Sequence, residues 1–183
     1  MSEASAHLRY ETLAAAPTAA DRAALAELLR ACVAGGASIG FLAPLAAAEA
    51  AAYWAGALGE TAGGGRTILV AREADGRIVG SAQIAFVAKP NGRHRAEVQK
   101  VLVLPTHRRR GIAARLMAEV ETQARARGVW LLHLDTSDSE AGARAFYEAL
   151  AYVYAGGIPG YATDTHGVPE RNAIFYKTLG PGA

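Results

Sequence analysis

The spacing of apolar residues along the chain alternates between the two-residue period of strands and the 3.6-residue period of helices. Short alternating or continuous apolar runs predict strands at 7–13, 66–73, 78–88, 95–104, 129–134, 152–155 and 173–179. Apolar residues three and four apart predict helices at 18–34, 44–58, 111–127 and 139–150. The predicted order is therefore βααβββαβαββ.

Local signals mark several of the predicted boundaries. Thr18 stands three residues before Asp21, which is the spacing of an N-terminal capping box. Gly35-Gly36 is expected to end that helix, and Pro44 is expected in the first turn of the next one. Asp75-Gly76 between two β-rich runs predicts a hairpin.

The element order predicts the fold class, which is α/β (α+β). A strand–helix–strand unit over 98–134 favours one parallel pair of strands inside an otherwise antiparallel sheet. No repeat or linker interrupts the pattern, and a length of 183 residues is typical of one domain, so residues 1–183 are expected to form a single domain.

Composition narrows the class of protein. Hydrophobic residues make up 51% of the chain, charged residues 20%, and the net charge is +2, which does not favour a nucleic-acid or membrane partner. No apolar run reaches the roughly 18 residues of a membrane span, and no secretory signal is apparent, so a cytoplasmic protein is expected. The single cysteine, Cys32, rules out an internal disulfide and is expected to be buried in a helix.

The most informative segment is 97–117, where a strand leads through a basic turn into a helix. Unpaired amides and the positive dipole end at a helix N-terminus suit an anion such as a phosphate. No Lys-Ser or Lys-Thr follows Gly111, which excludes a P-loop, and the turn has one glycine instead of the GxGxxG of dinucleotide sites. A solvated basic turn is the alternative interpretation.

The hexapeptide from Arg108 to Ala113 resembles the [RQ]xxGx[GA] signature of the GCN5-related N-acetyltransferases (GNAT). A second stretch, 145–152, resembles the late AxxxYEKxGF helix of that family. The resemblance implies a GNAT fold, in which two neighbouring parallel strands splay apart and acetyl-CoA, a co-substrate, enters the gap. No metal is expected, because the histidines have no recognisable ligand spacing.

The resemblance also implies roles for individual residues. The pyrophosphate of acetyl-CoA would be held by Arg108, Arg109, Arg110, Gly111, Ile112, Ala113 and Ala114. The pantetheine arm would pair with the backbone of Val101, Leu102 and Val103, with an amide near Val103 as donor to the thioester oxygen. Tyr147 would protonate the departing thiolate; a tyrosine that only packs on the sheet is the alternative.

Two carboxylates are candidates for the general base that deprotonates the acceptor amine, Glu97 and Asp135. Both are expected to face the gap between the splayed strands. The alternatives are a solvent-facing edge residue for Glu97 and a turn or helix-capping residue for Asp135. His133 is expected to be a buried structural residue, whereas His94, His107 and His166 are expected in surface turns.

The chain departs from the family pattern at two positions, Glu140, where the family often has asparagine, and Ala151, where it has glycine. Within the family, the stretches at 131–136, 146–152, 158–161 and 175–180 are similar to tabtoxin-resistance acetyltransferases. That similarity suggests a bacterial enzyme whose acceptor is a toxin-like or antibiotic-like small amine. Residues 35–65 are expected to shape the acceptor pocket.

The predicted function is acetyl-CoA-dependent N-acetylation of the primary amine of an amino acid-like, antibiotic-like or toxin-like small molecule by direct attack. The position of Cys32 in the first helix argues against a covalent acetyl-enzyme. Two alternatives stay open, which are a protein or peptide N-acetyltransferase and a non-catalytic acyl-CoA sensor. No nucleic-acid or membrane partner is expected, and both a monomer and a homodimer fit the sequence.

Overall fold

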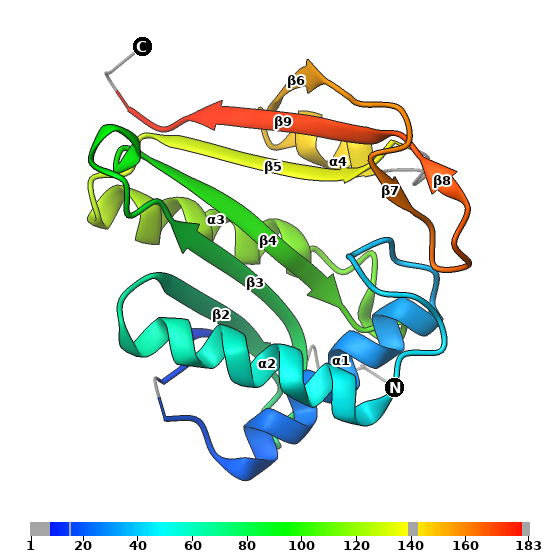
Figure 1. Cartoon of the computed structure of the whole chain (residues 1–183). Helices are drawn as coiled ribbons and strands as arrows, with labels where there is room; N and C mark the ends of the chain where they lie inside the picture. Colours follow the sequence, from blue (N-terminus) through cyan, green and yellow to red (C-terminus); the bar gives the residue numbers. More distant parts are fainter. Residues whose placement is uncertain (1–7, 15, 139–142, 181–183) are drawn as a thin grey trace, which may run out of the picture.

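The computed structural model describes residues 8–14, 16–138 and 143–180 (Figure 1). The long elements, in chain order, are β1 (Arg9–Thr12), α1 (Ala19–Ala34), α2 (Ala47–Ala62), β2 (Arg66–Arg72), β3 (Ile78–Phe86), β4 (Arg95–Val103), α3 (Ile112–Ala126), β5 (Leu131–Ser137), α4 (Ala143–Ala149), β6 (Val153–Gly156) and β9 (Asn172–Thr178). Their order confirms the predicted βααβββαβαββ. Two short strands, β7 (Ala162–Thr163) and β8 (Pro169–Glu170), form a separate hairpin between β6 and β9 that the sequence pattern did not predict.

The seven long strands form one mixed sheet in the order β1-β2-β3-β4-β5-β9-β6. Every neighbouring pair is antiparallel except β4 and β5, which are parallel and joined through α3. This confirms the predicted α/β class with one parallel pair in an otherwise antiparallel sheet.

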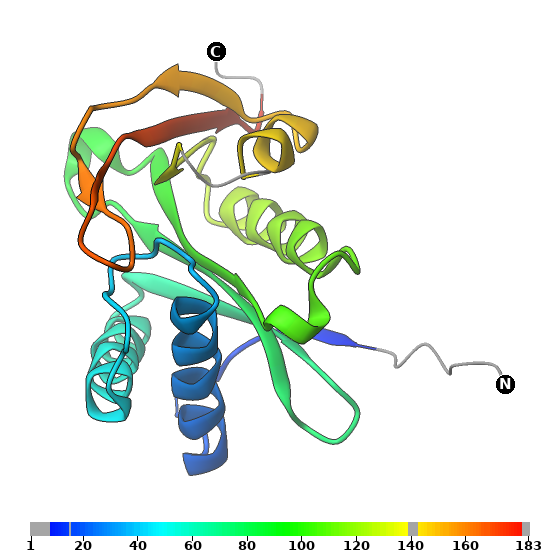
Figure 2. The same cartoon turned by 90° about the vertical axis from the view of Figure 1, so that its right-hand side faces the viewer.

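Helices cover both faces of the sheet. Helices α1 and α2 lie together on one face, and α3 and α4 lie on the other (Figures 1 and 2). The strands between these layers are apolar on both faces, as the fully buried run from Thr67 to Ala71 in β2 shows. Burial on two faces explains why these strands have continuous apolar runs in place of alternation.

The N-terminus of α1 is held by a capping box. The Thr18 hydroxyl accepts from the Asp21 amide at 3.1 Å, and the Asp21 carboxylate accepts from the Thr18 amide at 3.1 Å. Asp21 also pairs with Arg72 of β2 at 2.7 Å, so the cap ties α1 to the sheet. The predicted cap and the predicted end of the helix at Gly35 are both confirmed.

Removing this cap gives a first test of the fold. Thr18→Ala is expected to lower the free energy of unfolding by about 1 kcal/mol, because one amide of the first turn loses its acceptor. Urea denaturation followed by circular dichroism measures this loss. An unchanged denaturation midpoint would show that the box contributes nothing to stability.

Strands β4 and β5 separate along their length. Their parallel pairing runs from Arg95–Leu131 to Glu97–His133 and ends there. Beyond this point β4 has a bulge, where the register with β3 shifts between Ser81 and Gln83 and Lys100 adopts a positive φ of 48°. A bulge bends its strand, and in Figure 1 β4 leads away from β5 toward its C-terminal end.

Two local predictions differ from the structure, and a third lies outside the described residues. Helix α2 begins at Ala47, and Pro44 lies before it after a cis peptide bond, not in its first turn. Strand β5 continues to Ser137, three residues beyond the apolar run that predicted it, because polar residues at its end still pair with β9. The predicted start of the α4 helix at 139 and the departure at Glu140 lie outside the described residues.

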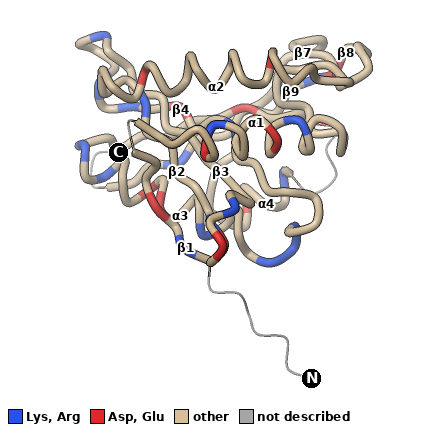
Figure 3. The backbone as a smooth tube through the Cα atoms, turned by 90° about the horizontal axis from the view of Figure 1, so that it is seen from below, with Lys and Arg blue, Asp and Glu red and all other residues tan. Residues whose placement is uncertain are grey.

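Charge is distributed without a dominant sign. In the view of Figure 3, acidic and basic segments are interspersed along the backbone. Within the described ranges, no helix has the length and apolar character needed to cross a membrane.

Candidate active site

A cavity of about 890 Å³ lies where β4 and β5 separate. Its walls come from both faces of the sheet: the N-terminus of α3 and the α4 helix on one side, and the α1–α2 loop with the β7–β8 hairpin on the other. The gap between the strands therefore connects the two faces. The sequence predicts the cofactor at the basic turn on the α3–α4 side and the acceptor near residues 35–65 on the α1–α2 side. We name the two sides after these predictions, the cofactor half and the acceptor half.

The basic turn forms one end of the cofactor half. Gly111 is the N-cap of α3 with φ of 76°, and Arg109 also has a positive φ of 62°. This backbone path turns the first amides of α3 toward the cavity, which Gly111, Ile112, Ala113 and Ala114 line together with Arg108 and Arg109. Amides at a helix N-terminus bind anions such as phosphate. Arg110 is not among the lining residues, and its role stays a prediction.

His107 stands at the start of the basic turn and was expected at the surface, but its side chain is buried and bonded to neighbouring residues. The side chain is only 8% exposed, and its Nε2 lies 3.2 Å from Glu73 Oε1 while Nδ1 lies 2.9 Å from the Thr106 hydroxyl. The prediction was wrong because Glu73, 34 residues earlier, provides a partner that turn composition does not reveal.

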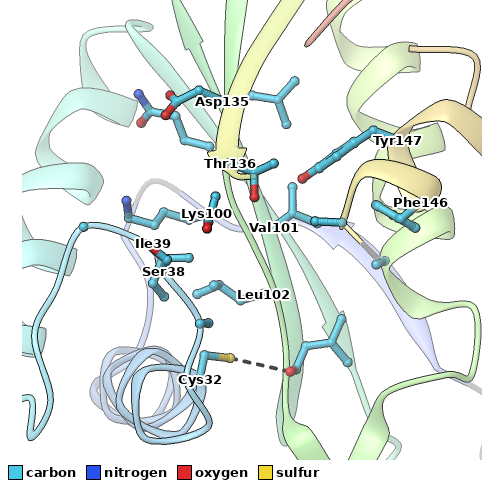
Figure 4. Close-up of a pocket in the computed structure, with 18 of the residues that line it drawn as sticks. Cys32, Ser38, Ile39, Lys100, Val101, Leu102, Asp135, Thr136, Phe146 and Tyr147 are labelled. Atoms are coloured by element: carbon cyan, nitrogen blue, oxygen red, sulfur yellow. Dashed lines mark hydrogen bonds between the residues drawn. The ribbon is translucent and has the colours of Figure 1, made fainter. Parts of the chain in front are cut away.

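The edge of β4 lines the middle of the cavity with Val101, Leu102 and Val103. Because β4 no longer pairs with β5 here, backbone groups on this edge are available to an extended ligand. The carbonyl of Val103 accepts a weak hydrogen bond from the Cys32 thiol at 3.5 Å (Figure 4). Burial raises the pKa of the Cys32 thiol, which keeps it protonated.

Tyr147 stands across the gap from β4. Its ring packs against Phe146, Tyr152 and Phe175, with ring centroids 5.0 to 5.9 Å apart, and the residue is 9% exposed. Figure 4 shows the ring reaching from α4 with its hydroxyl toward Val101 and Thr136. The aromatic packing fixes the direction of the hydroxyl, so both interpretations of this tyrosine, packing and chemistry, fit the same residue.

Both candidate bases line the cavity. Glu97 is half-buried at the last paired position of β4, opposite His133 of β5, which is also half-buried. Asp135 is exposed and lies two residues further along β5, where it pairs with Ile174 of β9. Asp135 is therefore a strand residue, and the alternative of a turn or capping residue is wrong.

The acceptor half contains a polar network that sequence reasoning missed. Arg66 donates to the side-chain oxygens of Gln83 and Gln99 at 2.6 and 2.7 Å, and the Tyr53 hydroxyl donates to Gln83 at 3.1 Å. Lys100 lies beside this network, with its ammonium 5.3 Å from the centroid of the Tyr53 ring. The adjacent polar pair Gln99-Lys100, which interrupts an apolar strand, was the signal in the sequence that this edge has a bulge.

Two segments far apart in the sequence are hydrogen-bonded to each other over the acceptor half. The Ser38 hydroxyl donates to the carbonyl of Thr163 at 3.3 Å, and the amide of Ala43 donates to the carbonyl of Thr165 at 2.8 Å. These bonds join the α1–α2 loop to the β7–β8 hairpin. The prediction that residues 35–65 shape this pocket holds for Ser38, Ile39 and Tyr53, which line it.

In the part of the chain that the structure describes, no group of three or more histidine, cysteine, aspartate or glutamate side chains could hold a metal ion.

The chain is similar in sequence to known acetyltransferases. A sequence profile of the acetyltransferase (GNAT) family matches residues 24–152. An uncharacterized N-acetyltransferase from the hisH-hisA intergenic region of Azospirillum brasilense is 36% identical over 107 residues, which are 57% of this chain and 61% of that protein. The chain thus aligns with less than two thirds of this relative's length.

Solved structures show the same fold at low sequence identity. A GNAT superfamily phosphinothricin acetyltransferase from Sinorhizobium meliloti, in complex with acetyl-CoA, has a TM-score of 0.78 at 22% identity, over 96% of this chain and 90% of that one. A ribosomal-protein-alanine N-acetyltransferase from Brucella melitensis has a TM-score of 0.75 at 22% identity, over 94% and 99%. The fold therefore occurs in proteins named for small-molecule and for protein acceptors.

Proposed function

The chain belongs to the acetyltransferase (GNAT) family, and from this premise we propose that it is an acetyl-CoA-dependent N-acetyltransferase for the primary amine of a small molecule. The observation that carries the proposal is the continuous cavity that crosses the sheet between β4 and β5. It has a phosphate-type turn at one end and two carboxylates at the other. A thioester held along β4 would meet an amine held on the far face.

Acetyl-CoA fits the residues of the cofactor half. The α3 amides and Arg108 would hold the pyrophosphate, and the free edge of β4 would pair with the pantetheine amides as a neighbouring strand does. Bound in this way, the thioester would lie near Val101 and the Tyr147 hydroxyl. Acetyl-CoA supplies the acyl group and the thiol leaving group, and the protein positions both.

The proposed reaction is a direct transfer. Asp135 or Glu97 accepts a proton from the ammonium of the acceptor, and the neutral amine attacks the thioester carbonyl. A backbone amide on the free β4 edge between Val101 and Val103 donates to the oxygen as negative charge develops there. The carbon–sulfur bond then breaks, and Tyr147 donates its proton to the thiolate. The extra proton on the attacking nitrogen passes to the Tyr147 oxygen, and the carboxylic acid releases its proton to solvent, so that a neutral amide, a free thiol and the starting enzyme remain. Holding amine and thioester together supplies much of the rate acceleration.

A small acceptor is favoured over a protein by the two hydrogen-bonded segments over the acceptor half. The hydrogen bonds from Ser38 and Ala43 to the β7–β8 hairpin restrict the opening that an extended peptide would need. The phosphinothricin acetyltransferase of the same fold supports the likeness to tabtoxin-resistance enzymes, so a role in resistance to a toxin or antibiotic is part of this proposal.

Direct transfer predicts that Cys32 is dispensable for the chemistry. Cys32→Ala should keep wild-type turnover, because the residue is 1% exposed and burial raises the pKa of its thiol, which keeps the thiol protonated. Steady-state kinetics and intact-protein mass spectrometry after mixing with acetyl-CoA check this. An acetyl adduct on Cys32, or loss of turnover in a folded Cys32→Ala variant, would replace direct attack with a covalent route.

The proposed function is tested by thiol release from acetyl-CoA with a panel of small amines and peptides assayed side by side. We expect release with small amines and formation of the N-acetyl product by mass spectrometry. Release with peptides alone would assign a protein acceptor. Acetyl-CoA binding without release from any amine would make the chain an acyl-CoA sensor and contradict the proposal.

A further inference from the structure

Lys100 is a cation in the acceptor half whose charge has no acidic partner within ion-pair distance. Its ammonium contacts the faces of two aromatic rings, 5.7 Å from the centroid of Phe41 and 5.3 Å from that of Tyr53. Among the described residues, no carboxylate lies within 4.0 Å of it. Burial lowers the pKa of Lys100, and the Arg66 charge lowers it further.

The strand is bent in a way that directs this lysine into the cavity. Side chains of consecutive strand residues normally point to opposite faces. At the bulge, with φ of 48° at Lys100, both Gln99 and Lys100 reach the α1–α2 face: Gln99 bonds to Arg66, and Lys100 covers Tyr53. Figure 4 shows Lys100 pointing away from Tyr147, toward the loop that carries Ser38 and Ile39. A positive φ at a residue other than glycine is costly and often marks a functional position.

Arg66, the neighbouring cation, has both an acidic partner and hydrogen-bond acceptors. Arg66 pairs with Glu60 at 2.9 Å and donates to two glutamine oxygens. Lys100 has no such partner in residues 8–14, 16–138 and 143–180, although it lines the cavity. A partly buried ammonium without a counter-charge is unfavourable, and an anion bound from solution would relieve that cost.

The carboxylates of this half provide the opposite charge at a distance. Asp135 and Glu97 both raise the pKa of Lys100 through their charge, yet neither is within ion-pair distance. Asp135 points to the same side of the sheet as Lys100 in Figure 4. The acceptor half therefore has a negative and a positive group separated by open space, which is complementary to a ligand with an ammonium and a carboxylate.

We propose that Lys100 binds a carboxylate of the acceptor, which makes the acceptor an amino acid or a close analogue with a free carboxyl group. The ammonium of the acceptor lies against Asp135 and Glu97. The carboxylate of the acceptor accepts a hydrogen bond from the Lys100 ammonium. Phe41 and Tyr53 hold the lysine stem. This inference rests on the proposed function and adds the chemical class of its substrate.

The test compares amino acids with their amides in the wild type and in Lys100→Met. The acceptors are α-, β- and γ-amino acids, each paired with its carboxamide, and the readout is KM and kcat by thiol release. We expect the wild type to prefer the acids, and Lys100→Met to raise KM for the acids about tenfold to a hundredfold, as for loss of a charged hydrogen bond. KM for the amides should not rise.

Two controls keep the result specific. Lys89→Met replaces an exposed lysine that does not line the cavity and should change neither KM. Acetyl-CoA affinity of Lys100→Met, by calorimetry, should match the wild type and shows that the variant is folded. If Lys100→Met does not fold, the preference of the wild type for acids over amides still decides.

The outcomes separate this inference from the proposed function. Equal KM values of the wild type for acids and amides would overturn the role of Lys100 in binding a carboxylate. So would an equal change of both KM values in Lys100→Met, which would give Lys100 a structural role only. Acetylation of other small amines but of none of these acids would also overturn the role of Lys100 and leave the proposed function standing. Acetylation of no amine at all, with acetyl-CoA bound, would overturn the proposed function instead.

Discussion

Tyr147→Phe is expected to lower turnover about a hundredfold and to leave the affinity for acetyl-CoA unchanged. A positioned general acid contributes roughly 10²-fold or more to a proton transfer. The ring of Tyr147 is fixed between Phe146 and Phe175, and phenylalanine keeps that packing. Steady-state kinetics and calorimetry with acetyl-CoA measure the two quantities.

Tyr152 provides a matched control for this substitution. Its ring contacts that of Tyr147 at 5.9 Å, but its hydroxyl is buried without a hydrogen-bond partner among the described residues. Tyr152→Phe therefore removes a hydroxyl from the same aromatic cluster without touching the gap, and should keep full turnover. Unchanged turnover in Tyr147→Phe would take the hydroxyl out of the mechanism and leave Tyr147 as a packing residue.

Gly111→Val is expected to weaken acetyl-CoA binding about tenfold. Gly111 has φ of 76°, a conformation that costs an L-residue roughly 1–2 kcal/mol and a β-branched one more. The variant can relieve this cost only by moving the turn, which displaces the α3 amides. Acetyl-CoA binding must then restore the strained turn, and the free energy of that strain is lost from the free energy of binding. A loss of about 1.4 kcal/mol corresponds to a tenfold lower affinity.

Gly128 at the other end of α3 is the control for strain alone. It has φ of 74°, and a Cβ added there or at Gly111 would meet nothing within 4 Å. Gly128→Val should therefore cost similar stability, measured by denaturation, without loss of acetyl-CoA affinity in calorimetry. Equal acetyl-CoA affinities in wild type and Gly111→Val would remove the turn from the cofactor site.

The sequence predicted the fold well because its strands and helices have strong local signals. The capping box at Thr18 and the basic turn before Gly111 are encoded within a few residues. The predicted strand ended three residues before β5 does, because the last residues of β5, including Asp135, are polar. These residues are extended because they pair with β9. The β7–β8 hairpin has two residues in each strand, which is too short for a periodic pattern.

Of the candidate site, the cofactor half could be predicted from the sequence and the acceptor half could not. The cofactor half rests on one contiguous segment and a helix, so its motifs could be found. The acceptor half depends on long-range contacts, such as Ser38 with Thr163 across 125 residues and Lys100 with Phe41. Local composition contains no signal for such contacts.

We expect acetyl-CoA to occupy the gap between β4 and β5, and a crystal structure of the complex is the most direct test. The pyrophosphate should lie on the α3 amides at Gly111–Ala114, the pantetheine arm along Val101–Val103, and the thioester sulfur near the Tyr147 hydroxyl. Acetyl-CoA bound elsewhere, or with its thioester away from Asp135 and Tyr147, would contradict this expectation.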